Sequence, residues 1–310
     1  MKTAGITSDT PVMVEVRQRG IGRLLADAVR RFRDADGMSH ARALGYQGTF
    51  AMLSGFIGLI GLASVLGIAT IRNTIIEMST GIAPGPSGQL LQEAARQSTG
   101  GGTAALFGLG AALISGALAT AQVERSANRL SGSTEDRPGA GRFLVALGLA
   151  VTAGALAVIG LVLLAGGQAF ATGFGWKGTA SDVWMVLRWV IGIIAAGSGI
   201  YLLFRWAPRQ PLGSRGELVA GMVVSLVLWV LFTIALSLWF ALSSSSQTYG
   251  PLISVIALLL WAGATAIALL IGMAVSAELA AQAPSRPATG PGAEGNGRHV
   301  RVPDVASDRT

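Results

Sequence analysis

The sequence contains no cysteine, only two histidines and few charged residues, and each of these shortages excludes a class of function. Without cysteine the chain can form no disulfide, no thiolate metal site and no cysteine nucleophile. The two histidines, His40 and His299, have no second histidine at the spacing that a zinc site needs. The sixteen acidic residues are scattered through loops and tails, whereas a nuclease would need them clustered around a metal ion.

Motifs of hydrolytic and nucleotide-driven chemistry are also absent from the sequence. There is no Walker A motif, which excludes ATP hydrolysis in the manner of a P-loop pump. The serine run at 243–246 lacks both the G-x-S-x-G context of a nucleophile and a nearby base. We therefore expect a protein that is not an enzyme and that holds no cofactor and no metal ion.

The composition is that of a chain in lipid rather than in water. Hydrophobic residues make up 51% of the chain and charged residues 13%, with a mean hydropathy of +0.58. A soluble domain carries about 25% charged residues, so a soluble fold of this size is excluded. The predicted fold class is an all-α integral membrane protein.

Six apolar stretches are long enough to cross a bilayer, which takes about 20 residues for roughly 30 Å of hydrocarbon. The last two contain no charge and are joined by a polar turn that ends at Pro251. All eleven prolines lie outside the interiors of the six stretches, which supports their boundaries. The predicted transmembrane domain covers residues 41–281, with spans at about 50–71, 103–123, 143–170, 183–204, 218–242 and 253–275.

Three segments lie outside the predicted spans. Residues 1–40 form a cytoplasmic region in which 12–36 has the spacing of an amphipathic interfacial helix. Two interpretations of this helix are open: it lies on the headgroups of an anionic leaflet, or it packs on the cytoplasmic ends of the bundle. A short helix is predicted at 89–97, with Ser87 as its N-cap. Residues 282–310 have too few apolar residues to fold and form a disordered cytoplasmic tail.

The distribution of basic residues predicts the orientation of the chain. Of the 23 lysines and arginines, 19 lie in the N-terminal region, the loop after span two, the connector after span four and the tail. These four segments share one side of a bundle with six spans. By the positive-inside rule, both termini are expected in the cytoplasm.

Arg188 is the basic residue predicted nearest to membrane depth, about two turns into span four. An arginine on lipid costs roughly 2 to 3 kcal/mol or less near the surface. Two interpretations are open for this side chain. It either reaches back to the interface or a structural partner, or it attracts an anion into a cavity.

Glu278 lies at the end of span six, where a carboxylate opposes the helix dipole by about 0.3 to 1 kcal/mol. A cationic partner would offset this cost. We expect that partner to be Arg129, Arg205 or Arg215, in a clasp that is structural.

Small and hydroxyl-bearing residues mark two helix faces. Gly108, Ala112, Gly116 and Thr120 form a four-residue repeat on span two, which predicts close approach of a neighbouring helix. On one face of span five lie three hydroxyl residues, for which interhelical hydrogen bonds of about 0.6 kcal/mol each are one explanation. A weakly polar path toward the Tyr249 turn is the other. The three residues are Ser225, Thr233 and Ser237.

Several short motifs, taken in order, carry a resemblance to a known family. They are Asn128-Arg129 after span two, Leu187-Arg188-Trp189 in span four, Tyr201 to Arg205 followed by Pro208, Tyr249-Gly250-Pro251-Leu252 before span six and Ala277-Glu278-Leu279 after it. Over roughly residues 41–280 the chain resembles the YihY/virulence factor BrkB family of bacterial inner-membrane proteins. The resemblance implies six spans with cytoplasmic termini and an envelope-related role, and members are sometimes labelled ribonucleases, which these residues do not support.

We therefore expect a multi-pass protein of the bacterial plasma membrane that acts as a transporter or lipid exporter in envelope maintenance. An anionic lipid or a small anion is the expected substrate, and membrane lipids are the expected partners at the N-terminal helix. No nucleic-acid partner is expected, and a homo-oligomer is left open. The alternative is a scaffold that does not transport and that recruits envelope proteins.

Overall fold

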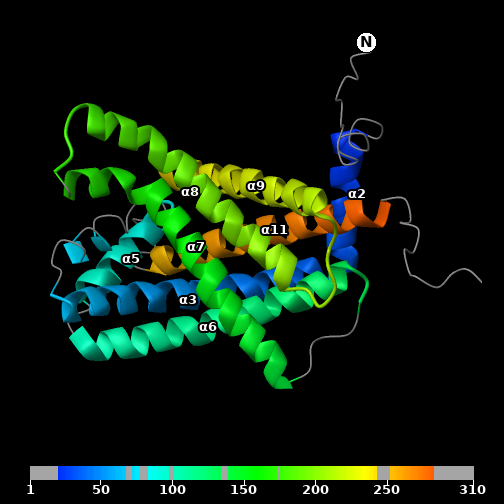
Figure 1. Cartoon of the computed structure of the whole chain (residues 1–310), viewed down its shortest axis with the longest axis horizontal. Coiled ribbons are helices and arrows are strands. Elements are labelled where there is room, and N and C mark those ends of the chain that lie inside the picture. Colours follow the sequence, from blue (N-terminus) through cyan, green and yellow to red (C-terminus); the bar gives the residue numbers. More distant parts are fainter. Residues whose placement is uncertain are drawn as a thin grey trace, which may run out of the picture.

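The computed structural model describes residues 20–67, 72–73, 75–76, 83–97, 101–133, 139–173, 175–242 and 252–282. Over these residues the chain forms eight helices and no strand. Six of them are long and apolar enough to cross a membrane (Figure 1). The helices are α2 Ile21–Asp34, α3 Gly37–Val65, α5 Pro86–Gln97, α6 Gly101–Leu130, α7 Gly139–Gly173, α8 Thr179–Trp206, α9 Arg215–Leu242 and α11 Leu252–Gln282.

Each of the six predicted spans falls on one long helix, namely α3, α6, α7, α8, α9 and α11. The helices extend beyond the predicted apolar stretches because backbone hydrogen bonding continues past the hydrocarbon. The largest differences are in α3, which begins at Gly37 rather than near 50 and ends at Val65 rather than near 71. Its early end has a local cause: Gly67 takes a positive φ of 69° and its N–H bonds to the carbonyl of Ser64.

The outer surfaces of these helices carry large apolar side chains. Val186, Ile194, Leu231 and Leu106 are all more than half exposed. In water an apolar surface of this extent would drive aggregation, whereas hydrocarbon solvates it without cost. The exterior of the bundle is therefore matched to a lipid environment.

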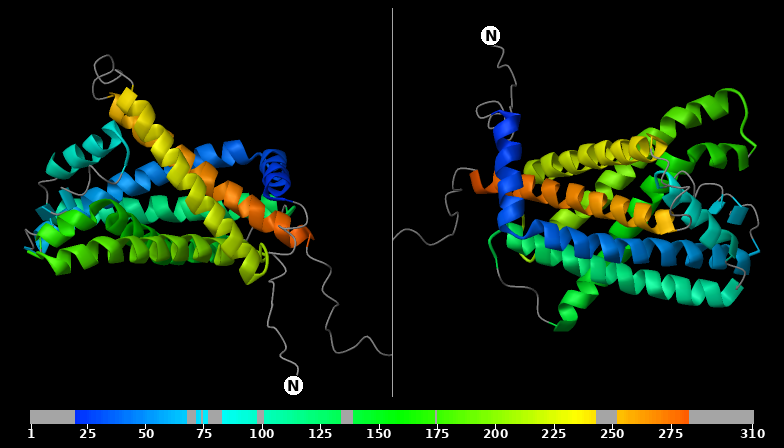
Figure 2. Two further views of the ribbon diagram at one scale, coloured as in Figure 1. Left: turned by 90° about the horizontal axis from the view of Figure 1, so that it is seen from above. Right: turned by 180° about the vertical axis from the view of Figure 1, so that it is seen from behind.

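Helix α11 is the central element of the bundle. It contacts α3 and α9 along its length and also touches α2, α5 and α6. Its membrane-crossing window is 44% buried, against 33% or less for the other five spans. Figure 2 shows α11 between α9 and α3, with α3 and α6 lying side by side. Positions on α11 therefore have the greatest influence on packing.

Glycines bring two helix pairs into backbone contact. A Cβ added at Gly58 of α3 would lie 2.5 Å from the backbone nitrogen of Leu109 on α6, and one added at Gly108 would meet the backbone of Gly58. The predicted packing role of the span-two stripe is thus confirmed at Gly108. On α9 and α11, Gly221 and Gly272 approach each other in the same way. Only residues without a side chain permit these contacts.

The short helices lie at opposite ends of the bundle (Figure 1). Helix α2 runs across one end, with Ala28 and Phe32 buried against the spans. The predicted start of its amphipathic stretch, residues 12–19, lies outside the described residues. At the other end α5 begins at Pro86. Ser87 therefore lies inside the helix, and its predicted role as the N-cap is wrong. The Ser87 hydroxyl instead donates to the carbonyl of Pro84.

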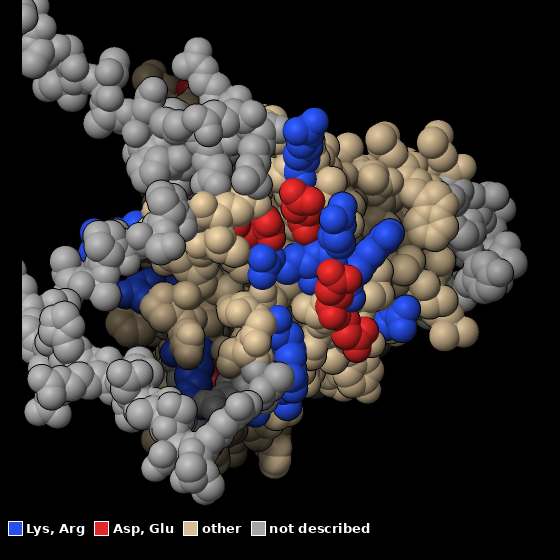
Figure 3. All heavy atoms as spheres, turned by 90° about the vertical axis from the view of Figure 1, so that its right-hand side faces the viewer, with Lys and Arg blue, Asp and Glu red and all other residues tan. Residues whose placement is uncertain are grey.

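Charged side chains gather on the end of the molecule that carries α2 (Figure 3). Helices α6, α8 and α11 end there, and α3, α7 and α9 begin there. The predicted sharing of one side by the N-terminal region, the loop after span two and the connector after span four agrees with this arrangement. The tail was predicted at residues 282–310; Gln282 is the last residue of α11, and residues 283–310 lie outside the described part of the chain.

Candidate functional site

A cavity of about 380 Å³ lies between the six spanning helices, and all six contribute to its wall. Most of the wall consists of leucine, alanine and glycine residues, with the indoles of Trp229 and Trp261 on α9 and α11. The described residues that line it include no charged side chain. We refer to this space as the central cavity.

The hydroxyl groups in the wall of the central cavity donate to backbone carbonyls. Thr120 donates to Gly116 at 2.9 Å and Thr265 donates to Trp261 at 2.8 Å, both within their own helices. Ser225 on α9 reaches the carbonyl of Leu269 on α11 at 3.5 Å. Since each hydroxyl hydrogen is already used, the cavity offers an incoming molecule a weakly polar wall. Such a wall suits a hydrocarbon chain better than a small anion, which would lose its hydration without replacement.

One interhelical hydrogen bond fixes the Trp261 side chain at the cavity wall. The Trp261 indole is 5% exposed, and its Nε1–H donates to Thr233 Oγ1 on α9 at 3.1 Å. The predicted interhelical hydrogen bonding of span five is therefore confirmed for Thr233 and Ser225. It is wrong for Ser237, whose hydroxyl donates to the carbonyl of Thr233 on its own helix.

Two glycines leave the central cavity open. A Cβ added at Gly48 on α3 or at Gly154 on α7 would meet no atom within 4 Å. Neither glycine is therefore needed for close helix contact. Larger side chains at these two positions would occupy the cavity rather than force helices apart.

At the end of the bundle that carries α2, Arg31 joins three helices. Its Nε donates to Glu278 Oε2 on α11 at 2.7 Å, and an Nη donates to the carbonyl of Leu130, the last residue of α6, at 3.0 Å. Gln282 donates from Nε2 to the other carboxylate oxygen of Glu278. We call the contact between Arg31 and Glu278 the clasp.

The clasp corrects the predicted partner of Glu278, which was Arg129, Arg205 or Arg215. The actual partner comes from α2 because that helix crosses the end of α11, and this placement cannot be read from the spacing of span residues. The predicted structural role of the contact agrees with its geometry. Arg129 lies nearby, in the wall of a surface pocket of about 420 Å³ that also includes Glu278.

Arg205 and Arg188, two further arginines singled out from the sequence, each lie over the ring of the tryptophan that follows them. The Cζ of Arg205 lies 5.4 Å from the centroid of the Trp206 ring, and that of Arg188 lies 5.6 Å from the Trp189 centroid. Arg188 does not line the central cavity. Its Nε is shielded from solvent and has no hydrogen-bond partner among the residues that the structure describes.

Tyr249, Gly250 and Pro251, which carry the motif before span six, lie outside the described residues. Asn128 of the motif after span two has a clear position. It is 2% exposed, and its Oδ1 accepts the backbone N–H of Arg209 at 3.0 Å. This bond ties the connector after α8 to the end of α6.

Two polar contacts near the same end of the bundle are not predicted from the sequence. Gln122 Nε2 lies 2.6 Å from Nδ1 of His40, and the buried carboxylate of Glu124 lies 3.7 Å from Nε of Arg142. The sequence signal that could have indicated these contacts is that the helix of span two continues into polar residues at its end. In the described ranges no three histidine, aspartate or glutamate side chains lie together as a metal site would require.

The comparisons with known proteins give one result. The model of a family described as Virulence factor BrkB matches residues 28–295 of the chain. No curated protein and no solved structure matches it. The matched residues include the second half of α2 and all six spanning helices.

Proposed function

We propose that this chain, which belongs to the virulence factor BrkB family, moves a lipid across the bacterial plasma membrane in the course of envelope maintenance. Family membership and six apolar helices make it a multi-pass membrane protein. The observation that carries the proposal is the central cavity, to which all six spans contribute and whose described wall has no charge. A lipid chain is the substrate that such a wall accommodates at the lowest cost.

The same cavity bears on the two alternatives from the sequence. A small anion would require a cation in the wall, and Arg188 is not part of that wall. A scaffold without transport has no need of a space between its spans. Of the two substrate classes expected from the sequence, an anionic lipid and a small anion, the proposal therefore keeps the lipid and drops the small anion.

The orientation proposed is the one that the positive-inside rule gives, with α2 and the clasp at the cytoplasmic face. In that orientation Arg23, Arg30 and Arg33, which are exposed on α2, add positive charge at the cytoplasmic surface beside the inner leaflet. Ala28 and Phe32 on its apolar side contact the bundle. Helix α2 would thus combine the two interpretations, packing on the bundle while its basic side meets anionic lipid.

The experiment uses liposomes that contain the purified protein and a phospholipid with a fluorescent headgroup, quenched from outside by a reductant that does not cross the bilayer. The expected result is that the protein exposes inner-leaflet lipid, so that the quenched fraction rises above the half reached without protein. Gly154→Leu fills the cavity and should lower the rate at least severalfold. Gly148→Leu, on the same helix and also with no atom within 4 Å, is the matched control outside the wall.

Thermal unfolding of both variants in detergent serves as the control for folding. The proposal is contradicted if the quenched fraction with wild-type protein equals that of empty liposomes under every gradient applied. It is also contradicted if Gly154→Leu, folded as stably as the control, moves lipid at the wild-type rate.

A further inference from the structure

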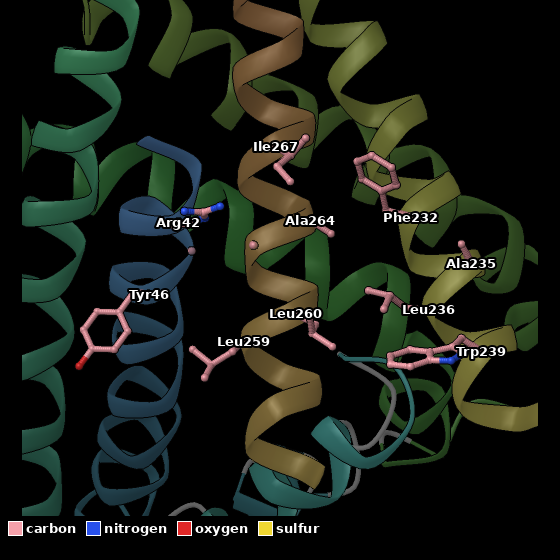
Figure 4. Close-up of a pocket in the computed structure, with 12 residues that line it drawn as sticks. Arg42, Tyr46, Phe232, Ala235, Leu236, Trp239, Leu259, Leu260, Ala264 and Ile267 are labelled. Carbon is pink, nitrogen blue, oxygen red and sulfur yellow. The ribbon is translucent and has the colours of Figure 1, made fainter. Parts of the chain in front are cut away.

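A second cavity, of about 670 Å³, lies on the outside of the bundle and opens between α3 and α9 over the surface of α11 (Figure 4). We call it the side groove. It is separated from the central cavity by α11, whose residues alternate between the two. Gly263 and Ala264 face the side groove, whereas Ala262 and Ala266 line the central cavity.

The side groove has the length of one leaflet. On α11 its lining runs from Leu259 to Ile267, which corresponds to about 12 Å at a rise of about 1.5 Å per residue. Half of a hydrocarbon core of roughly 30 Å is about 15 Å. Its volume falls within the range of about 300 to 1,000 Å³ that ligand sites occupy. The groove is therefore of a size to hold the chain of one lipid, not a molecule that spans the bilayer.

The described lining of the side groove is mostly apolar and carries one charged side chain. On α9 and α11 the groove is lined by Phe232, Leu236, Trp239, Leu260 and similar side chains. Figure 4 shows Leu260 and Leu236 in the space between those two helices. Lipid acyl chains can cover these apolar side chains without a desolvation penalty.

The exception is Arg42, on the first turns of α3. Figure 4 shows its guanidinium directed toward α11 at the level of Ala264. Arg42 is exposed, and within the described part of the chain its guanidinium takes part in no ion pair or hydrogen bond. The next turn carries Tyr46, whose phenol suits the boundary between headgroups and chains. A cation, an amphipathic ring and an apolar channel thus follow one another from the interface inward.

We propose that the side groove binds one phospholipid with an anionic headgroup. Its phosphate pairs with Arg42, and one acyl chain lies along α11 between α3 and α9. A lipid headgroup supplies the counter-charge that Arg42 lacks, and the guanidinium can bind a phosphate through two parallel hydrogen bonds. The choice of a lipid as the ligand rests on the proposed function. Binding of that lipid can nevertheless be measured at equilibrium, without transport.

The test measures lipid binding by native mass spectrometry. The full-length protein in detergent is mixed with equal amounts of phosphatidylglycerol and phosphatidylethanolamine that carry the same acyl chains. The wild-type protein should retain the anionic lipid in preference. Arg42→Gln should lower this preference about fivefold, the factor expected for one basic residue at an anionic surface. Arg96→Gln, exposed on α5 at the opposite end of the bundle, should leave the preference unchanged.

A second pair of variants tests the acyl-chain channel. A Cβ added at Gly263 meets no atom within 4 Å, so Gly263→Phe fills the groove without displacing a helix and should reduce binding of both lipids. Ala235→Trp fills the same groove from α9 and serves if the first variant does not fold. Gly110→Phe, which also has open space but lies on α6 away from the groove, should bind both lipids like the wild type.

The proposal is overturned if the wild-type protein shows no preference for the anionic lipid, or if Arg42→Gln keeps it. It is also overturned if folded groove-filling variants bind as much lipid as Gly110→Phe. A dimer that Gly263→Phe dissociates would assign the groove to a second copy of the chain instead. Lipid retention at Arg42 without movement in liposomes would refute the proposed function alone, and movement without this retention would refute the side-groove proposal alone.

Discussion

Arg31 and Glu278 are 247 residues apart in the sequence, and their side chains meet at 2.7 Å across the end of the bundle. The same arginine donates to the carbonyl of Leu130, an acceptor that the end of α6 leaves without an intrahelical partner. The contact therefore fixes α2 to both α6 and α11. Its strength decides how firmly the N-terminal helix is held.

Breaking the clasp should release α2. The two side chains are 27% and 14% exposed, so the pair is only partly screened by solvent. Glu278→Gln is expected to lower the free energy of unfolding by about 1.5 to 3 kcal/mol, the range for hydrogen bonds to charged groups. Because the chain has no cysteine, Ala28→Cys gives a single thiol that is buried in the wild-type background. Its labelling rate in detergent should rise with Glu278→Gln and stay low with Arg33→Ala.

The contact between α9 and α11 should not tolerate a side chain at Gly272. A Cβ there would meet the Ser225 hydroxyl and the carbonyl of Gly221. Overpacking of this kind costs about 1 to 3 kcal/mol, so Gly272→Ala should lower the temperature of unfolding in detergent. Gly110→Ala on α6, where the added group meets open space, is the control. Equal unfolding temperatures for the two variants would contradict the close approach of α9 and α11.

The hydrogen bond between Trp261 and Thr233 predicts a difference between two hydroxyl residues on α9. Thr233→Val removes the acceptor of a buried indole N–H, which costs about 1 to 3 kcal/mol when it is left unsatisfied. Ser237→Ala removes only a bond within one helix and should change stability by a few tenths of a kcal/mol. Unfolding in mixed micelles measures both. A larger effect at Ser237 than at Thr233 would show that Trp261 bonds elsewhere.

Orientation can be tested with single thiols in the chain, which has no other cysteine. Lys177→Cys lies between α7 and α8, at the end of the bundle away from α2, and is exposed. Arg215→Cys begins α9 at the α2 end and is exposed as well. With cytoplasmic termini, an impermeant reagent added to intact cells should label only the first. Labelling of the second alone would invert the proposed orientation.

The six spans were predictable because hydropathy acts locally. A run of apolar residues long enough to cross hydrocarbon has no alternative fold in lipid, and the prolines mark its limits. Helix ends were less predictable, since they depend on single residues. The left-handed Gly67 ends α3 at Val65 inside a stretch that is still apolar in sequence.

The clasp and the cavities could not be predicted, since they depend on how helices are placed in space. Hydropathy places Arg31 and Arg129 on the same side of the membrane and does not distinguish them as partners of Glu278. Only the crossing of α2 over α11 brings Arg31 to that carboxylate. The central cavity exists because glycine and alanine at facing positions, such as Gly154, leave space between six helix faces. A small residue can equally bring two helices together, as Gly272 does, and sequence alone does not distinguish the two effects.

The placement of small residues on α11 makes this helix a thin partition. Around Gly263, the side groove and the central cavity are separated mainly by the α11 backbone and by alanine methyl groups. Gly45 of α3 lies against the same stretch of backbone: a Cβ added at Gly45 would lie 2.8 Å from the Gly263 Cα. The side groove and the central cavity are thus one helix diameter apart. A modest rotation of α11, or its separation from α3, would join the side groove to the central cavity. A lipid could then enter the protein sideways from the bilayer, without passage through water.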